Sequence, residues 1–277
     1  MNRIRKMEFY DLVSNIIVVF FALLNLFPLY WLVTSSFKTS TDIFRMPPDW
    51  WPQNFILNNF QELFRTAPAL RWTFNSIFVS FATTFLLVAI SCLSAYAFAK
   101  LQFKGKRILF VLLLSTLMVP KEIFLVPLFR MIIAFNWVNS YQAMIFPNLA
   151  SAFGLFLLVG FFSAITNSIR DSGMLDGANE FTIFYKLCLP IAKPGIGALF
   201  ILFFVQIWND YLWQLVVTNS RDMRTLMVGV GTLMQELTPN FGLRMAGATV
   251  AAVPMIIIFV FFQSYFTRGI TLGAVKE

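Results

Sequence analysis

Long apolar runs alternate with short polar segments along the whole chain, and this pattern predicts membrane-spanning helices. A helix needs about 20 mostly apolar residues to cross about 30 Å of hydrocarbon. Six runs approach or exceed that length: residues 12–33, 74–99, 108–125, 143–165, 195–217 and 246–266. The sequence therefore predicts an all-α integral membrane protein with six transmembrane helices in a single membrane domain over residues 1–277.

The third run gives the weakest signal. Its uninterrupted apolar stretch, Ile108–Val119, covers about 18 Å at about 1.5 Å per residue. The span must therefore extend toward Lys121 and Glu122, whose long side chains can reach an interface. The stretch after it, Ile123–Trp137, is interrupted by proline and arginine and predicts an amphipathic or surface helix.

Basic residues cluster between the apolar runs, and their distribution predicts the orientation. With six spans both termini lie on one side, which carries more Lys and Arg over fewer residues. The strongest cluster is Lys100, Lys104, Lys106 and Arg107. Because positive charge marks the cytoplasmic side, both termini are predicted to be cytoplasmic. The first run is too long for a signal peptide and predicts an uncleaved span.

Composition narrows the class of protein. The chain is 58% hydrophobic and 12% charged, far from the roughly 45–50% and about 25% of soluble proteins. The net charge of +8 forms no basic stripe, which argues against nucleic-acid binding. The absence of histidine excludes His-based catalysis and most zinc sites, so no catalytic or metal site is expected. Cys92 and Cys188 are expected to be small hydrophobes rather than a disulfide.

Polar and aromatic residues recur at helical spacing in the fifth run. The stripe and its aromatic neighbours are Gln206, Trp208, Asn209, Asp210, Tyr211, Trp213 and Gln214. An acid deep in a span is costly against lipid, so Asp210 should face protein or water. In one interpretation the stripe lines a translocation cavity, and the aromatic rings stack on a sugar. In the other, the polar groups join helices and the tryptophans belong to an interfacial belt.

The second run carries a stripe of small residues that predicts close packing rather than solute contact. Its members are Ser76, Ser80, Thr84, Leu87, Ser91 and Ser94. Small residues also gather at the start of the sixth run and receive the same interpretation.

The polar loop at residues 167–194 predicts a short helix, a bend and a second short helix. Ser168 with Asp171 resembles a capping box, Gly177 provides the bend, and Asn179 can cap the next turn. Four residues are predicted to share one face of the second helix: Phe181, Phe184, Tyr185 and Cys188. Such a helix pair suits docking into a groove, although an ordinary interfacial loop has the same composition.

The loop resembles the EAA loop of binding-protein-dependent ABC importer permeases. The family pattern is Glu-Ala-Ala, three residues, Gly, nine residues and Ile-x-Leu-Pro. Matching positions are Asp176, Gly177, Ala178, Leu187, Leu189 and Pro190. The opening departs from the pattern, because Asp171-Ser172-Gly173 keeps the acid and loses both alanines.

The wider chain is similar to the MalG-like sugar permeases. Segments Ser94–Arg107, Trp208–Asp210 and Phe262–Glu277 support this resemblance. It implies the type I ABC importer permease fold, with a transmembrane type-1 core at 71–266 and a cytoplasmic coupling loop at 167–194. The residues that the resemblance assigns to ATPase coupling are Asp171, Ser172, Gly173, Asp176, Gly177, Ala178, Phe181, Phe184, Tyr185, Leu187, Leu189 and Pro190.

The resemblance also implies a function and partners. The chain would be a permease subunit that moves a mono- or oligosaccharide across a prokaryotic cytoplasmic membrane by alternating access. Its partners would be a MalF-like second permease, two ATPase subunits and an extracytoplasmic sugar-binding protein. ATP and Mg would bind to the ATPases, with no cofactor on this chain. The 219–245 segment would face the binding protein, and Gly269–Lys276 would reach toward the ATPase dimer interface.

Three alternatives follow from the same residues. Another polar solute, such as glycerol phosphate, could replace the sugar. A secondary transporter would need ion-coupling residues or broken helices in symmetric halves, and Asp210 is the one clear acid deep in a predicted span. An intramembrane enzyme would need a nucleophile–base or metal constellation. The sequence contains no GxxxxGK[ST] pattern, so the chain is not expected to hydrolyse ATP.

Overall fold

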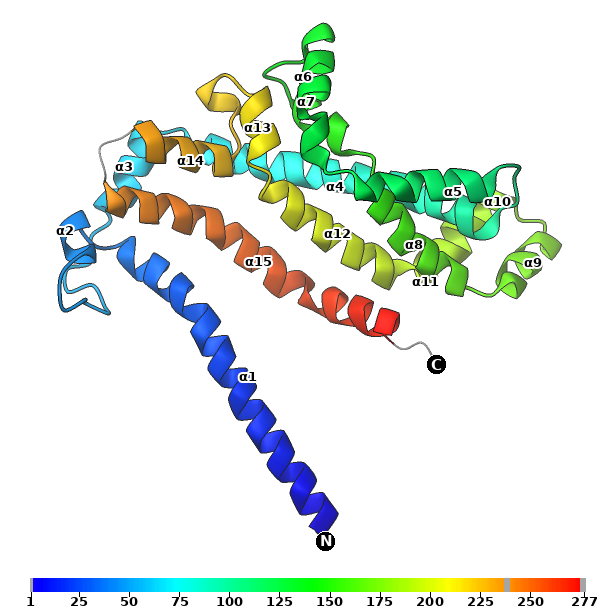
Figure 1. Cartoon of the computed structure of the whole chain (residues 1–277), viewed down its shortest axis with the longest axis horizontal. Coiled ribbons are helices and arrows are strands. Elements are labelled where there is room, and N and C mark those ends of the chain that lie inside the picture. The colour runs from blue at the N-terminus through cyan, green and yellow to red at the C-terminus, as the bar shows by residue number, and fades with distance from the viewer. Residues whose placement is uncertain (1, 237–239, 275–277) are drawn as a thin grey trace. The chain divides into compact units, whose positions relative to one another are not determined.

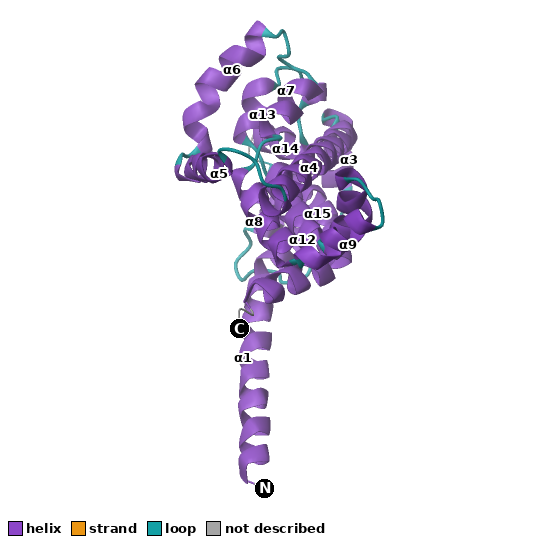
Figure 2. Ribbon diagram, turned by 90° about the vertical axis from the view of Figure 1, so that its right-hand side faces the viewer, coloured by secondary structure: helices purple, strands orange, loops and turns teal. Residues whose placement is uncertain are grey.

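The computed structural model describes the backbone of residues 2–236 and 240–274 and the side chains of residues 11–233 and 240–261. Every regular element in these ranges is a helix, and loops join the helices (Figure 1, Figure 2). The predicted all-α class is confirmed. The contact predicted for Gly269–Lys276 lies outside the described side chains, as do residues 237–239 of the predicted 219–245 segment.

Two compact units make up the chain. One comprises Met1–Ala69 with Val230–Val253, and the other comprises Leu70–Gly229 with Pro254–Glu277. Helices α14 (Leu226–Glu236) and α15 (Phe241–Ala274) each contribute to both units. Much of the predicted 219–245 segment is therefore helical.

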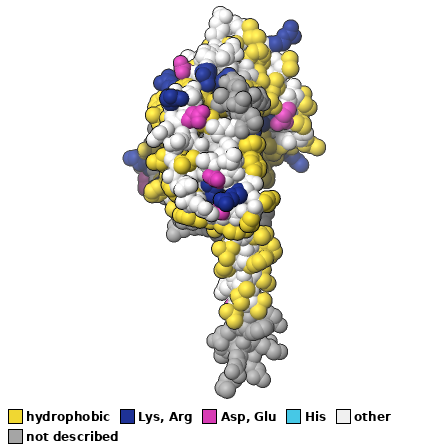
Figure 3. Space-filling model, turned by 90° about the vertical axis from the view of Figure 1, so that its left-hand side faces the viewer, with side chains coloured by type: hydrophobic (Ala, Val, Ile, Leu, Met, Phe, Trp, Pro, Cys, Tyr) yellow, Lys and Arg dark blue, Asp and Glu magenta, His cyan; other side chains and the backbone are white. Residues whose placement is uncertain are grey.

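Helix α1, Asn2–Ser35, opens the first unit. Its stretch Asp11–Ser35 is long and apolar enough to cross a membrane, and none of its hydrophobic window is buried within the chain. Figure 3 shows it as a mainly hydrophobic column. A helix that is apolar on every side needs lipid or a partner chain around it.

The remainder of the first unit is a folded segment between α1 and α3 (Asn58–Thr66), with the short helix α2 (Ser40–Ile43) inside it. The buried amide of Asn59 donates to the carbonyl oxygens of Ser36 at 2.9 Å and Lys38 at 2.8 Å. These two bonds satisfy carbonyls just past the end of α1, where intrahelical partners run out. They fix the path of the chain as it leaves the helix.

The second unit is built along α4, Ala69–Lys100. The small-residue stripe of this helix packs against the rest of the chain, because Ser76, Ser80, Thr84, Leu87 and Ser91 are all buried. Ser76 shows how a hydroxyl is satisfied there, since its Oγ accepts from the backbone nitrogen of Leu226 at 2.7 Å. The packing interpretation of the stripe is confirmed.

Two apolar clusters lie along α4. One surrounds Cys92 and Tyr96 and includes side chains of α8 (Ala152–Ala164), the 167–194 loop and α12 (Lys193–Trp208). The other surrounds Val79 and includes α6 (Leu125–Ala134), α7 (Tyr141–Ile145) and α13 (Leu212–Val217), which Figure 1 shows gathered together. Both cysteines are free and buried, as expected.

Three unbroken helical stretches in the described chain are suited to crossing a membrane: Asp11–Ser35, Ala69–Lys100 and Phe241–Phe261. Three further candidates are bent pairs, which raise the count to six if each pair is one span. They are Lys106–Met118 with Lys121–Ala134 at 93°, Tyr141–Asn148 with Ala152–Ala164 at 50°, and Glu180–Ile191 with Lys193–Trp208 at 76°.

The first two pairs contain α5 (Lys106–Ser115) and the short elements η1 (Thr116–Met118), η2 (Lys121–Phe124) and η3 (Phe146–Asn148). Outside the pairs, η5 (Arg221–Met223) follows α13.

The helix breaks correct three predicted spans. The fourth, predicted at 143–165, is interrupted between Asn148 and Ala152, where its two halves meet at 50°. The third span was predicted to run to Leu125, but its helix ends at Met118, because Pro120 keeps Val119 extended and lacks an N–H for the ladder. The fifth was predicted to run to Val217, but α12 ends at Trp208 and α13 begins at Leu212. Polar residues therefore sit at helix breaks rather than along one continuous helix.

Candidate functional site

The 167–194 loop is a helix, a tight turn and a second helical segment, as predicted. Helix α9 runs from Asn167 to Leu175. It ends in a Schellman motif, in which the nitrogen of Ala178 donates to the oxygen of Gly173 at 2.9 Å and that of Gly177 to Met174 at 3.0 Å. Gly177 has φ of 77°, a left-handed conformation that favours glycine. The predicted bend at Gly177 is confirmed.

The second helical segment has three parts. They are α10 (Glu180–Thr182), a π-helix (Ile183–Cys188) and α11 (Leu189–Ile191). Asn179 caps its start, because its side-chain oxygen accepts from the nitrogen of Thr182 at 2.8 Å. This confirms the predicted cap.

The predicted capping box at the start of the loop is wrong. Helix α9 has Thr166 as its N-cap, one residue before Asn167. The Ser168 hydroxyl donates to Oγ1 of Thr166 at 3.0 Å and accepts no backbone N–H of the helix. Sequence spacing suggested a cap at Ser168, whereas the cap and the helix start lie two residues earlier.

The predicted common face of Phe181, Phe184, Tyr185 and Cys188 is also wrong. Phe181 and Tyr185 are 69% and 62% exposed, whereas Phe184 and Cys188 are buried. The π-helix explains the split, since its wider turns align residues four apart and separate residues three apart. Two aromatic rings are therefore exposed beside the apolar cluster, and the Phe181 ring lies 6.3 Å from that of Phe184 between ring centroids.

Gly173 lies where the family pattern has an alanine, and its neighbours explain the smaller residue. A β-carbon there would lie 3.0 Å from Cδ1 of Leu187 and 3.1 Å from Cγ1 of Ile183. Both contacts are tighter than ordinary van der Waals packing. The glycine thus lets α9 approach the π-helix closely.

A charged and hydrogen-bonded network joins the two parts of the loop to α4. The Arg170 guanidinium pairs with the Glu180 carboxylate through Nη2, and its Nε lies 3.4 Å from Oε2. The Tyr96 hydroxyl of α4 donates to the same oxygen at 2.7 Å. The Arg170 guanidinium lowers the pKa of Glu180 against the opposing effect of burial, so this carboxylate is ionised at neutral pH.

Lys100, one turn beyond Tyr96 on α4, makes a second attachment. Its ammonium donates to the carbonyl oxygen of Ile165 at the end of α8, and to Oδ1 of Asn167 at 3.1 Å. The side chain is buried, although it belongs to the basic cluster that the sequence analysis used only to assign the cytoplasmic side. A cation at the carboxyl end of a helix is stabilised by the backbone carbonyls there.

Sequence reasoning missed the roles of Tyr96, Lys100, Arg170 and Glu180. The sequence did contain a signal for the Arg170–Glu180 pair, because residues of opposite charge flank the predicted turn at Gly177. The partners on α4 could not be found in this way, because they lie about 70–85 residues away in the sequence and pairing across that separation depends on the fold.

The loop presents an apolar surface on this rigid base. We define the Leu175–Tyr185 surface as the exposed side chains of Met174, Leu175, Phe181 and Tyr185, of which Leu175 is 89% exposed. Asp171, Ser172, Asp176 and Pro190 are also exposed, whereas Ala178, Leu187 and Leu189 are half-buried. The predicted coupling residues therefore divide into a buried set that shapes the loop and an exposed set that a partner can contact.

The polar stripe of the fifth run does not form one helix face. Helix α12 ends at Trp208, and Asn209 is its C-cap. Gln206 and Asn209 are exposed, whereas Asp210, Trp213 and Gln214 are buried. The extrapolated spacing failed because the chain changes direction between the two halves of the stripe.

Asp210 lies at the start of α13 and is the centre of this break. Its Oδ1 accepts from the backbone nitrogen of Trp213 at 3.3 Å, and its Oδ2 lies 4.0 Å from Nζ of Lys121. Lys121 itself follows the break after α5. Two helix breaks are thus joined by one ion pair.

The aromatic rings beside Asp210 face protein. The Trp208 ring is buried and stacks on Phe204 at 6.1 Å, and the buried Trp213 ring donates from Nε1 to the carbonyl oxygen of Ala143 at 3.0 Å. Tyr211 is half-buried. Stacking on a sugar by Trp208 or Trp213 would require these rings to leave their present partners.

Gln214 adds a second buried polar group on α13. Its Nε2 contacts the carbonyl oxygen of Met144 at 3.5 Å, while its Oε1 has no hydrogen-bond partner in the described chain. The described residues bring together no group of three or more Asp, Glu or Cys side chains suited to a metal.

Comparison with known proteins gives these sites a context. Residues 88–272 match the family described as binding-protein-dependent transport system inner membrane component. The chain is 34% identical over 270 residues to the arabinooligosaccharides transport system permease protein AraQ of Bacillus subtilis (strain 168), covering 96% of both chains. It is 28% identical to the sn-glycerol-3-phosphate transport system permease protein UgpE of Brucella abortus (strain 2308), covering 94% of this chain and 95% of UgpE.

A crystal structure shares the fold. It is that of a bacterial ABC transporter involved in the import of the acidic polysaccharide alginate, with a TM-score of 0.80 at 20% identity. The match covers 94% of this chain and 97% of that one. The family match spans the 167–194 loop, both helix breaks and α4 from Val88 onward. The chain therefore belongs to the family of inner membrane components of binding-protein-dependent transport systems.

Proposed function

We propose that the chain is one of two permease subunits of an ATP-driven importer for a mono- or oligosaccharide. Membership of the binding-protein-dependent transport family carries this proposal. The sugar class is supported by the relative AraQ, whose name assigns it to arabinooligosaccharide transport. The partners would be a MalF-like second permease, two ATPase subunits that bind ATP and Mg, and an extracytoplasmic sugar-binding protein.

In this proposal the chain crosses a prokaryotic cytoplasmic membrane six times, with both termini inside. Three unbroken helices and three bent pairs give up to six spans by length and composition. In the last pair the Glu180–Ile191 half belongs to the 167–194 loop, so α12 would be its spanning half. The basic cluster at Lys100–Arg107 supports the cytoplasmic assignment of the α4 end that carries the 167–194 loop.

The Leu175–Tyr185 surface is proposed to dock into a cleft of the ATPase subunit. Exposed Leu, Phe and Tyr side chains on short helices are suited to burial in an apolar groove. Because Glu180 and Lys100 attach the loop to α4, displacement of the surface would move that helix with it. The loop would thus act as a rigid lever for alternating access.

The first prediction concerns this docking surface. Leu175→Asp and Phe181→Asp should each reduce retention of the ATPase subunits by roughly tenfold or more, because a carboxylate would be buried in an apolar groove. Retention is measured by quantifying ATPase that copurifies with the tagged chain. Leu70→Asp, an equally exposed change at the opposite end of α4, is the control.

Equal retention by the Leu175, Phe181 and Leu70 variants would contradict docking at this surface. Comparable membrane expression of all three must be established by immunoblot, so that a loss of ATPase is not a loss of the chain.

The second prediction concerns the ion pair. Arg170→Glu and Glu180→Arg should each lower uptake per ATP hydrolysed by about tenfold, because like charges would face each other across the Gly177 turn and repel. The double variant with both changes should recover part of the loss, because it restores opposite charges across the turn. The control is Lys104→Glu, which reverses the charge of an exposed residue in the Lys100–Arg107 cluster. It should leave the uptake per ATP hydrolysed unchanged.

Uptake and ATP hydrolysis are measured together in vesicles that contain the assembled complex. If the double variant is as defective as the worse single variant, direct pairing is not what matters at these positions.

The third prediction concerns the buried acid at the helix break, which we propose borders the translocation pathway with Gln206, Asn209, Tyr211 and Gln214. Asp210→Leu should lower uptake by roughly tenfold or more while all subunits still copurify. Asp210→Asn, which keeps an oxygen for the Trp213 N–H and loses the charge opposite Lys121, should have an intermediate effect.

The matched control is Asp222→Leu, because Asp222 lies exposed in η5. Normal uptake by Asp210→Leu would leave the break as a packing feature alone. Loss of copurifying subunits would indicate a structural role instead.

Glycerol phosphate is the second candidate substrate, because the relative UgpE carries that solute in its name. The two classes differ in charge, so the binding protein should discriminate strongly between them. Calorimetric titration of the cognate binding protein with arabinooligosaccharides and with glycerol 3-phosphate decides between them. Binding of glycerol 3-phosphate alone would overturn the sugar assignment.

A further inference from the structure

The loop between α2 and α3 exposes large apolar side chains. In residues 44–51, called the 44–51 loop below, Met46 is 87% and Trp51 64% exposed. Phe44 contacts Phe241 with ring centroids 4.6 Å apart, so one end of the loop is attached to the first unit. Met46 and Trp51 are left largely exposed in the described part of the chain.

The loop folds back along α1 instead of extending away from it. The Tyr30 hydroxyl donates to the carbonyl oxygen of Trp50 at 2.6 Å. The Trp50 ring lies 5.9 Å from Phe27 and 6.1 Å from Trp31 between ring centroids. Tyr30 precedes the helix end at Ser35 by five residues, which places Trp50 about 7.5 Å back along the helix axis.

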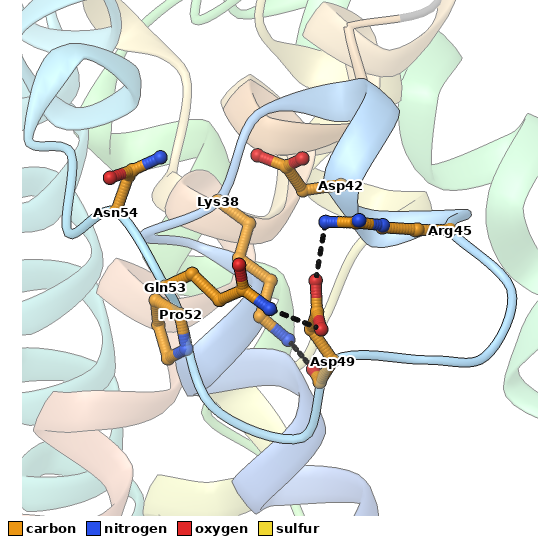
Figure 4. Close-up of a pocket in the computed structure, with 7 residues that line it drawn as sticks. All are labelled: Lys38, Asp42, Arg45, Asp49, Pro52, Gln53 and Asn54. Carbon is orange, nitrogen blue, oxygen red and sulfur yellow. Dashed lines mark hydrogen bonds and ion pairs between the residues drawn. The ribbon is translucent and has the colours of Figure 1, made fainter.

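A buried lysine fixes this position (Figure 4). Lys38 is only 1% exposed, and its ammonium donates to the carbonyl oxygen of Asp49 and lies 4.5 Å from the ring centre of Trp31. The Asp49 carboxylate accepts from Nε2 of Gln53 at 2.9 Å and pairs with Arg45 at 3.6 Å. Lys38 thus holds the loop against the end of α1, whereas the Arg45 and Gln53 contacts of the Asp49 carboxylate fix the loop internally.

The length of α1 sets the depth of the loop. The stretch Asp11–Ser35 contains 25 residues and is about 38 Å long, whereas the hydrocarbon core is about 30 Å thick. Centred on the core, the stretch extends about 4 Å beyond it at each end, so Tyr30 and Trp31 lie near the boundary between hydrocarbon and headgroups. Tyrosine and tryptophan are enriched at that level because their rings are amphipathic.

We propose that the 44–51 loop lies in the headgroup layer of the membrane, where Met46 and Trp51 bind the lipid surface. The loop continues the uncovered apolar surface of α1 at the depth where an interface is expected. Arg45 is 58% exposed at its side chain and can contact lipid phosphate. A water-soluble partner docks beyond the headgroups, whereas Trp50 lies below the end of the spanning helix. This proposal depends on α1 crossing the membrane and is independent of the substrate and of ATPase coupling.

Spin labelling tests the depth directly. The full chain, in complex with its copurifying subunits, is placed in vesicles of phosphatidylethanolamine and phosphatidylglycerol. Cys92→Ala and Cys188→Ala give a background without native thiols, and Trp51→Cys carries the nitroxide. Leu24→Cys, seven residues before Trp31 on α1, is the deep reference. Collision with oxygen and with a water-soluble nickel chelate gives depth, calibrated with spin-labelled lipids.

We expect the label at position 51 to lie near the phosphate level, shallower than position 24 and with reduced access to the nickel chelate. Access equal to that of a label in buffer would overturn the proposal, because the loop would then project into water. Protection from both reagents would also overturn it, since a protein partner would then cover the loop.

A second variant tests whether Lys38 holds the loop in place. Lys38→Met should increase the mobility of the label at position 51 and shift it toward water, because Asp49 loses its buried donor. Lys193→Met, an exposed lysine of the second unit, should change neither quantity. Unchanged depth and mobility of the label in Lys38→Met would overturn the role of Lys38 in holding the loop.

Discussion

The Glu180 carboxylate is the contact on which the geometry of the 167–194 loop depends. It accepts from Arg170 in α9 and from Tyr96 in α4, so one side chain joins three segments that the Gly177 turn would otherwise leave hinged. Surface ion pairs alone contribute about 0–1 kcal/mol. Here the carboxylate of the pair also accepts from Tyr96 of a long helix. The three side chains must therefore be positioned together, and this fixes the orientation of the loop more strongly than the energy of the ion pair suggests.

Helix α4 connects this contact to the far end of the second unit. Its 32 residues span about 48 Å as one unbroken helix. Tyr96 and Lys100 bind the loop near one end, whereas Asn75 near the other accepts from Tyr141 at 2.7 Å and donates to backbone oxygens of Asp222 and Arg224. The buried small-residue stripe between them allows neighbouring helices to approach closely. Polar contacts at both ends and close packing between them make α4 a suitable rod for transmitting displacement.

Local patterns in the sequence predicted the elements well and their interruptions poorly. Apolar length identified the helices, and Gly177 and Asn179 were identified by turn and cap chemistry that depends on neighbouring residues. The breaks near Pro120 and Asp210 are each flanked by apolar segments. A prediction from apolar length therefore extends a single helix across each of them. The π-helix at Ile183–Cys188 was also unpredictable, because its register follows packing of the loop against Gly173.

The break at Asp210 gives the polar residues of the fifth run a different meaning. A helix that ends inside a membrane exposes backbone groups that lipid cannot satisfy, so polar side chains and neighbouring helices must do so. Asp210 satisfies one such group, the N–H of Trp213, and Asn209 Nδ2 donates to the carbonyl oxygen of Val205 at 2.8 Å. Asp210 and Asn209 therefore have roles in the break itself, before any solute is considered. The second carboxylate oxygen of Asp210 is buried without a hydrogen bond in the described chain and lies 4.0 Å from the half-exposed Lys121. That oxygen is the polar group at this break that the local backbone does not use, which is why the translocation proposal centres on Asp210.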